Sequence, residues 1–192
     1  MFGLIRRTFR FLDENMFLPL YKTYVRSHLD FCSSVWAPYL DKHIEKIEQV
    51  QKRATRQIPG FRELTYPERL RKLKLPTLSY RRLRGDLIET YKILHNIYDP
   101  QTVKFLKLWD DATTRNSTYS GNSMKLYPRY SRLDLRKFSF SIRVVKHWNN
   151  LPDNVITAPS VNCFKNRLDK HYSDSPKMYD EYKREKNDGL NR

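Results

Sequence analysis

One long stretch of helical periodicity constrains the fold of this chain more than any other feature. Between Leu78 and Tyr98 the apolar residues recur mainly at steps of three and four. Such steps place the side chains along one face of an α-helix. The residues on this face are Leu83, Leu87, Ile88, Tyr91, Leu94 and Tyr98. Because other elements must cover an apolar helix face, the pattern favours a helical bundle.

Similar spacing predicts helices over residues 15–34, 42–58 and 135–148. Asp41 is the predicted N-cap of the second of these helices. Its expected apolar stripe consists of Ile44, Ile47, Val50, Ala54 and Ile58. A capping box at Thr65 and Glu68 predicts a short helix that ends at Pro76. Ser160 is expected to cap a last helix that contains Val161, Phe164 and Leu168.

These elements predict a mostly α fold, with a small helical bundle followed by a second, smaller helical unit. The first domain is expected over residues 15–99 and the second over residues 124–172. Residues 100–123 are polar without periodicity and are predicted to form a loop-rich linker. Residues 173–192 carry balanced charges and few apolar side chains, which predicts a disordered tail.

The charge of the chain indicates a polyanionic partner. Lys and Arg number 37 against 21 Asp and Glu, so the formal net charge is +16. No apolar run approaches the roughly 18 residues of a membrane span, so an integral membrane protein is not expected. Two distant cysteines without suitably spaced His partners predict free thiols, no zinc site and a reducing, intracellular compartment, nuclear or cytoplasmic. Charge alone leaves nucleic acid, an acidic protein or simple solubility as explanations.

Catalytic motifs are missing from the sequence. It contains no phosphate-binding glycine loop, no nucleophile elbow and no dinucleotide fingerprint. Asp110 and Asp111 are the one tempting metal-binding pair, but no strand–turn–strand pattern surrounds them. We therefore expect a protein that is not an enzyme, with no catalytic residues, no metal site, no cofactor and no small-molecule substrate.

Basic side chains on the predicted helices are the candidate contacts to phosphates. They fall into three groups along a chain that is rich in aromatic residues, and exposed aromatic side chains could stack on unpaired bases. The candidates are Lys52, Arg53, Arg56, Arg81, Arg82, Arg84, Arg132, Arg136 and Lys137. A solvated helix face is the alternative explanation for each group. Trp36 and Trp148 are expected in the core rather than as stacking platforms.

Two stretches resemble a known family. The first runs from Leu20 through Trp36-Ala37-Pro38-Tyr39 to Arg56, and the second from Ser131 through His147-Trp148-Asn149-Asn150-Leu151-Pro152 to Lys165. In order and spacing they are similar to the C-terminal part of reverse transcriptases from LINE-type, non-LTR retrotransposons of the CR1 or jockey kind. The resemblance covers roughly residues 15–172.

The resemblance implies a thumb-like first half, which grips template–primer, and a downstream domain of little-known role. It also implies that the catalytic palm and the endonuclease lie outside this chain, so exposed apolar surface is expected where a palm would pack. One departure concerns Thr118-Tyr119-Ser120-Gly121-Asn122, where the family pattern leads us to expect Thr-Arg-Gly-His. Any function of the missing Arg and His is therefore in doubt.

The sequence thus predicts a nucleic-acid-binding C-terminal fragment of a retrotransposon reverse transcriptase that lacks the polymerase aspartates. Its expected partners are an RNA–DNA template–primer or RNA, and an intact reverse transcriptase, with no membrane partner. The alternative is a protein-interaction module, or a decayed transposon-derived reading frame with no activity of its own.

Overall fold

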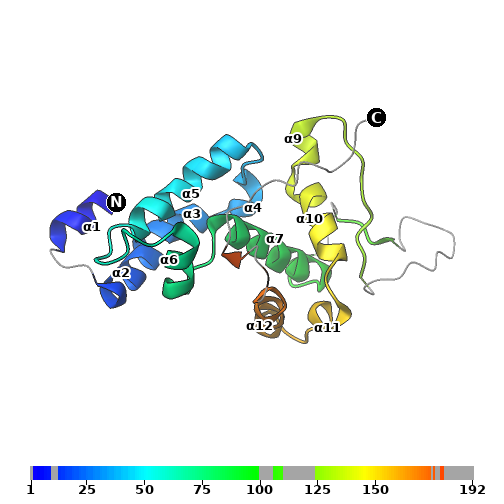
Figure 1. Cartoon of the computed structure of the whole chain (residues 1–192). Helices are drawn as coiled ribbons and strands as arrows, with labels where there is room; N and C mark the ends of the chain where they lie inside the picture. The colour runs from blue at the N-terminus through cyan, green and yellow to red at the C-terminus, as the bar shows by residue number, and fades with distance from the viewer. Residues whose placement is uncertain are drawn as a thin grey trace. The chain divides into compact units, whose positions relative to one another are not determined.

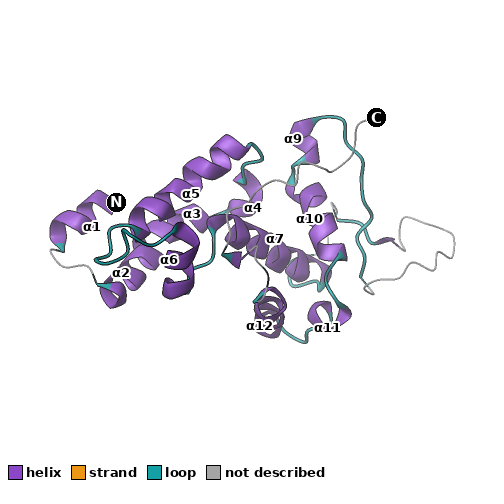
Figure 2. Ribbon diagram, in the orientation of Figure 1, coloured by secondary structure: helices purple, strands orange, loops and turns teal. Residues whose placement is uncertain are grey.

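The computed structural model describes residues 2–9, 13–99, 106–109, 124–173, 175 and 178–179, and this part of the chain is mostly helical (Figures 1 and 2). The predicted mostly α fold is therefore confirmed. Within the same residues no helix is long and apolar enough to cross a membrane. The elements are α1 (Phe2–Thr8), α2 (Glu14–Leu20), the π-helical η1 (Tyr21–Arg26), α3 (Ser27–Asp30), α4 (Ser33–Trp36), α5 (Asp41–Thr55), α6 (Tyr66–Leu73), α7 (Leu78–Leu94), α9 (Asp134–Lys137), α10 (Phe140–Asn149), α11 (Asp153–Ile156) and α12 (Val161–Tyr172).

The chain forms two compact units whose boundary lies inside α7. Unit 1 draws on residues 1–31, 38–81 and 176–192, and unit 2 on residues 32–37 and 82–175. This division differs from the predicted domains over residues 15–99 and 124–172. Because α7 is one continuous helix, no local sequence signal marks the change of unit between Arg81 and Arg82.

Unit 1 has an apolar core that α2, η1, α5 and α6 share. The ring of Phe17 stacks on that of Tyr21, with 5.4 Å between the centroids. The same core contains buried side chains of η1, α5 and α6 and of the segments that follow α5 and α6: Val25, Ala54, Ile58, Phe61, Tyr66, Leu70, Leu73 and Leu75. Tyr179 packs against this cluster, and the Met178 carbonyl accepts a hydrogen bond of 3.0 Å from the Thr77 N–H. Most of the predicted tail lies outside the described residues, but these two residues belong to unit 1.

The buried face of α5 is largely polar, whereas the sequence analysis predicted an apolar face for this helix. Ile44, Ile47 and Val50 are only partly buried. The side chains that face inward are Glu48, Gln51, Ala54 and Thr55, followed by Ile58 beyond the helix end. Polar residues occupy this face because buried hydroxyl groups and a helix N-terminus lie opposite them and need hydrogen-bond partners.

A buried hydrogen-bond network joins α5 to its neighbours within unit 1. The Tyr21 hydroxyl donates to Gln51 Oε1 at 2.7 Å, and Gln51 Nε2 donates to the Tyr66 hydroxyl and to the Pro76 carbonyl, both at 3.0 Å. The Tyr66 hydroxyl in turn donates to Glu48. Both carboxylate oxygens of Glu48 accept the backbone N–H of Leu78 at 3.1 Å, which places a carboxyl group at the N-terminus of α7.

Local signals at the helix ends were mostly predicted correctly. The capping box is present, with Glu68 accepting the Thr65 backbone N–H at 2.7 Å. Ser160 caps α12 and accepts the Cys163 N–H at 3.2 Å. The prediction for Asp41 was wrong by one residue, because Leu40 is the cap and Asp41 lies in the first turn of α5.

Two predicted helices are interrupted in the structure. The helix expected over residues 15–34 breaks at Cys32, whose left-handed backbone, with φ of 50°, separates α3 from α4. The helix expected over residues 135–148 divides into α9 and α10, with Ser139 as the cap of α10. A stripe of apolar residues does not reveal such breaks because it continues across them.

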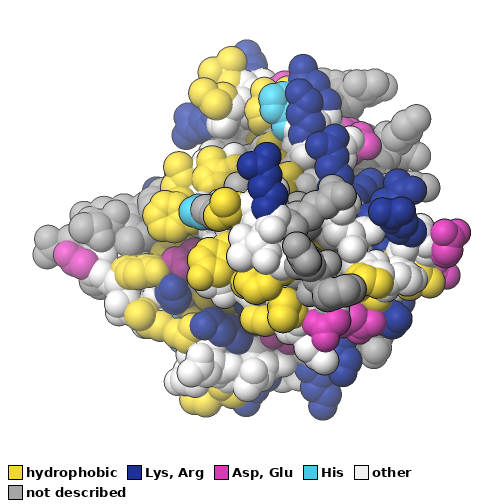
Figure 3. Space-filling model, turned by 90° about the vertical axis from the view of Figure 1, so that its left-hand side faces the viewer, with side chains coloured by type: hydrophobic (Ala, Val, Ile, Leu, Met, Phe, Trp, Pro, Cys, Tyr) yellow, Lys and Arg dark blue, Asp and Glu magenta, His cyan; other side chains and the backbone are white. Residues whose placement is uncertain are grey.

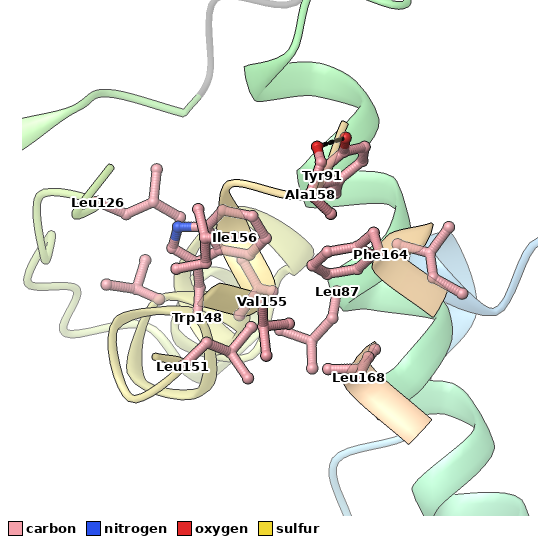
Figure 4. Packing of buried hydrophobic residues seen from close by; sticks show 13 residues of the cluster. Leu87, Tyr91, Leu126, Trp148, Leu151, Val155, Ile156, Ala158, Phe164 and Leu168 are labelled. Atoms are coloured by element: carbon pink, nitrogen blue, oxygen red, sulfur yellow. Dashed lines mark hydrogen bonds between the residues drawn. The ribbon is translucent and has the colours of Figure 1, made fainter. Parts of the chain in front are cut away.

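Trp148 is the centre of the apolar core of unit 2 (Figure 4). Its side chain is 0% exposed, and its indole N–H donates to the Met124 carbonyl at 2.8 Å. The ring of Phe164 lies 6.1 Å from Trp148 and 4.4 Å from Tyr91, centroid to centroid. The Tyr91 hydroxyl donates to the Ala158 carbonyl at 2.5 Å. The prediction that Trp148 belongs to the core is confirmed.

Two short extended segments complete unit 2. Leu108 and Leu126 form an antiparallel bridge, so residues 106–109, which were predicted as linker, pack within this unit. Asn149 at the end of α10 holds the same segment: its side chain accepts the Leu126 N–H at 2.8 Å and donates to the Leu126 carbonyl at 2.9 Å. The polar part of the predicted linker, including Asp110 and Asp111, lies outside the described residues.

An ion pair in unit 2 joins α10 to α7. Arg143 binds Asp86 through two hydrogen bonds of 2.9 and 3.0 Å and also donates to the Ser34 carbonyl at 2.8 Å. The Asp86 side chain is only 6% exposed. The carboxylate of Asp86 therefore depends on Arg143 for compensation of its buried charge.

We predict that Arg143→Met destabilises the protein by about 3 kcal/mol, because it leaves a buried carboxylate without its cation. The free energy of unfolding in urea measures this effect. Arg136→Met, at an exposed position of α9, is the control and should change stability by less than about 0.5 kcal/mol. Equal effects of the two variants would contradict this role of Arg143.

We predict that stability falls above about pH 10 and that Tyr21 contributes to the fall. Burial, and secondarily the Glu48 carboxylate, raises the pKa of Tyr21 above its ordinary value of 10.0. Above that pH the unfolded chain releases the phenolic proton while the folded chain retains it, so alkali favours unfolding. In Tyr21→Phe the unfolding free energy should still fall with pH, but the slope should be smaller than that of the unmodified protein by about 1.4 kcal/mol per pH unit. The exposed Tyr24→Phe serves as the control, and an identical slope in both variants would refute the prediction.

Candidate nucleic-acid interface

The C-terminal end of α5 carries the first group of predicted phosphate contacts. Arg53 and Arg56 are exposed, and Lys52 is partly exposed. Lys52 and Arg53 lie in the last turn of the helix and Arg56 is its C-cap. Cations at this end stabilise the helix dipole, which accounts for part of their placement.

Arg69 of α6 joins this group, and the sequence analysis did not identify it. Its Nη1 donates to the Lys52 carbonyl at 3.3 Å. The Arg69 guanidinium and the Lys52 Nζ lie 5.6 and 5.5 Å from the centroid of the Tyr66 ring, within the range of cation–π attraction. We name Lys52, Arg53, Arg56 and Arg69 the α5–α6 cation cluster. The helical spacing of Tyr66, Arg69 and Leu70 signals only that Arg69 borders a buried face.

Like charges meet in the α5–α6 cation cluster. Burial, followed by the neighbouring Arg56 guanidinium, lowers the pKa of Arg69 from its ordinary value. No ion pair in the described part of the chain joins a carboxylate to Arg53, Arg56 or Arg69. The cluster therefore concentrates positive charge that these residues do not neutralise among themselves.

The second predicted group, in the first turns of α7, is placed differently. Arg81 pairs with Asp30 at 2.7 Å in unit 1. In unit 2, Arg84 binds both oxygens of Asp169 at 2.6 and 2.7 Å, and Arg82 is only 6% exposed. Cations in the first turns of a helix interact unfavourably with the helix dipole, and the carboxylates of Asp30, Asp169 and Glu48 offset this effect in α7. The structure thus gives Arg81 and Arg84 a structural ion pair each and buries Arg82.

The third group lies in unit 2 on a segment that is both cationic and apolar. Arg132, Arg136 and Lys137 are exposed, and Lys137 Nζ lies 5.6 Å from the Phe138 ring centroid. Between them, Leu133 and Leu135 are 73% and 84% exposed, and Tyr130 is also exposed. We name residues 130–137 the α9 segment. Its character fits contact with a partner that is anionic, apolar or both.

Aromatic side chains that reach the surface complement the cations. Trp36 is 39% exposed, so its predicted place in the core was wrong; it lies on the four-residue helix α4, beside exposed Val35. Other exposed aromatic residues are Tyr24, Phe31, Tyr98, Tyr127 and Tyr130. In Figure 3, Lys and Arg side chains alternate with hydrophobic ones over the face that is drawn.

The described residues offer no comparable arrangement for metal or thiol chemistry. Among them, no group of three or more His, Cys, Asp or Glu side chains could hold a metal ion. Cys32 and Cys163 are both free thiols. The exposed cations of the α5–α6 cation cluster and of the α9 segment are suited to binding anions.

Comparisons with known proteins add no relative. No known protein family, no curated protein and no solved structure matches this chain.

Proposed function

We propose that this protein binds the sugar–phosphate backbone of nucleic acid, in the manner of the thumb-like region of a LINE-type reverse transcriptase, and performs no polymerisation itself. The observation that carries the proposal is the α5–α6 cation cluster. Three of its cations lie at the C-terminal end of α5, and the fourth, Arg69 of α6, donates to the Lys52 carbonyl. Lys52 and Arg69 both lie over the ring of Tyr66.

The physical basis of the binding is electrostatic. Each phosphate that a Lys or Arg neutralises releases condensed counterions, which favours association at low salt. Exposed Arg53 and Arg56 can follow a backbone without reading bases, so little sequence preference is expected. An RNA–DNA template–primer is the expected ligand because the resemblance to the reverse transcriptase family includes the stretch that ends at Arg56.

We propose contacts from two of the three predicted groups of cations. Lys52, Arg53 and Arg56 remain the primary contacts, with Arg132, Arg136 and Lys137 as a separate second surface in unit 2. Arg81 and Arg84 are left out because phosphate binding would break the ion pair that each of them forms. Arg82, which lies between them in the chain, is left out with them.

Fluorescence anisotropy with a labelled RNA–DNA hybrid tests the proposal. The affinity should fall steeply as salt rises, with a slope in a log–log plot of about −0.9 per neutralised phosphate. Arg53→Gln with Arg56→Gln should weaken binding and reduce this slope by about 2. The reason is that two phosphate contacts are lost without any change in the buried face of α5.

The matched control removes the same charge from the other end of the same helix. Lys42 and Lys46 are exposed on α5, and Lys46 lies seven residues, or about 10 Å, before Arg53. Lys42→Gln with Lys46→Gln should leave most of the affinity and slope intact. Binding that does not respond to salt, or equal losses in both double variants, would contradict a local phosphate grip.

A second candidate function is that of a protein-interaction module, favoured by the α9 segment. Leu133 and Leu135 are exposed far beyond what a solvated surface requires. The partner expected from the sequence is an intact reverse transcriptase of the resembled family. In the variant with Leu133→Ser and Leu135→Ser, the protein should no longer capture that purified enzyme but should still bind the RNA–DNA hybrid. Unchanged capture of the enzyme would show that the α9 segment is not the interaction surface.

A further inference from the structure

The guanidinium of Arg69 is the most unusual charged group in unit 1. The residue is only 7% exposed, although it carries a full positive charge. No carboxylate forms an ion pair with it in the described part of the chain. After burial, the neighbouring cation Arg56 has the largest effect on the pKa of Arg69, and it lowers that pKa. A buried cation without an anion is costly, and native structures usually supply one.

The N–H groups of the Arg69 guanidinium differ in whether they have a hydrogen-bond partner. Nη1 is engaged with the Lys52 carbonyl, and the guanidinium plane approaches the ring of Tyr66. The Nε–H is buried and has no hydrogen-bond partner. In a guanidinium, Nε and Nη2 form the side that grips two oxygens of a phosphate or carboxylate at once. On this side of Arg69, the Nε–H has no hydrogen-bond partner in the protein.

The surroundings select the ligand class. Arg56 is exposed and its charge acts on Arg69, so both cations attract an anion that approaches this end of α5 from solvent. Bidentate binding by one arginine and neutralisation by a second favour a tetrahedral oxyanion with more than one charged oxygen. Tyr66 directs its hydroxyl toward Glu48 and Gln51, which leaves its ring, and no acceptor, beside Arg69.

We infer that Arg69 and Arg56 form a subsite for a phosphoryl group, held by the Nε side of the Arg69 guanidinium. The inference rests on the proposed function in one respect, namely that the phosphoryl group would belong to a nucleic-acid backbone. Inorganic phosphate carries the same chemistry and is the second possible source.

The direct test is NMR observation of the Arg69 Nε–Hε resonance in the full chain. Titration with inorganic phosphate, against sodium chloride at equal ionic strength, should shift this resonance selectively. An RNA–DNA hybrid should shift it in the same direction and at lower concentration, because neighbouring cations bind adjoining phosphates. No shift with either probe overturns the inference.

The two proposals fail separately. If anisotropy detects salt-dependent binding of the hybrid while the Arg69 resonance stays unmoved by both probes, the subsite is refuted and the proposed function stands. If inorganic phosphate moves the resonance and the hybrid does not bind, the subsite is upheld and the proposed function is refuted.

A conservative variant of Arg69 tests whether binding needs the planar pair of N–H donors or only a positive charge. Arg69→Lys retains a cation but loses the planar pair of donors, and it should weaken phosphate binding by about tenfold, the loss expected for one charge-assisted hydrogen bond. Arg62→Lys, at an exposed position of the same unit, should have no effect. Circular dichroism checks that both variants fold, and equal affinity of Arg69→Lys and the unmodified protein would contradict the bidentate geometry.

Discussion

A carboxylate buried at a helix N-terminus is the interaction on which unit 1 depends. Glu48 of α5 accepts the Leu78 N–H at the start of α7 and the hydroxyl of Tyr66 from α6. Gln51, one turn later, joins Tyr21, Tyr66 and the Pro76 carbonyl. Because the four side chains of this network are buried, their directional hydrogen bonds fix how the helices of this unit meet more strictly than apolar contacts could.

Tyr66 connects this network to the surface where we place function. Its hydroxyl lies in the buried network, and the face of its ring is next to Lys52 and Arg69. The last turn of α5 and the first turns of α6 are therefore held together from inside, while Lys52 and Arg69 lie over the same aromatic ring. A binding surface built on such fixed elements loses little conformational entropy when a ligand binds.

The sequence predicted the helical class, the capping box at Thr65 and the burial of Trp148, because local spacing and capping chemistry determine these features. It did not predict the polar buried face of α5, since the partners of Glu48 and Gln51 are far away in the chain. For the same reason it placed Arg81 and Arg84 among the phosphate contacts, although Asp30 and Asp169 pair with them, and it overlooked Arg69. Helix breaks such as the one at Cys32 depend on backbone conformation that apolar spacing does not encode.

The central claim is that the α5–α6 cation cluster receives the backbone of a nucleic acid. Mapping backbone amide shifts of the full chain during titration with an RNA–DNA hybrid tests it most directly. The account predicts the largest shifts at residues 52–56 and 69, with small ones at residues 42–46 of the same helix. Shifts confined to unit 2, or spread evenly over all exposed cations, would contradict it.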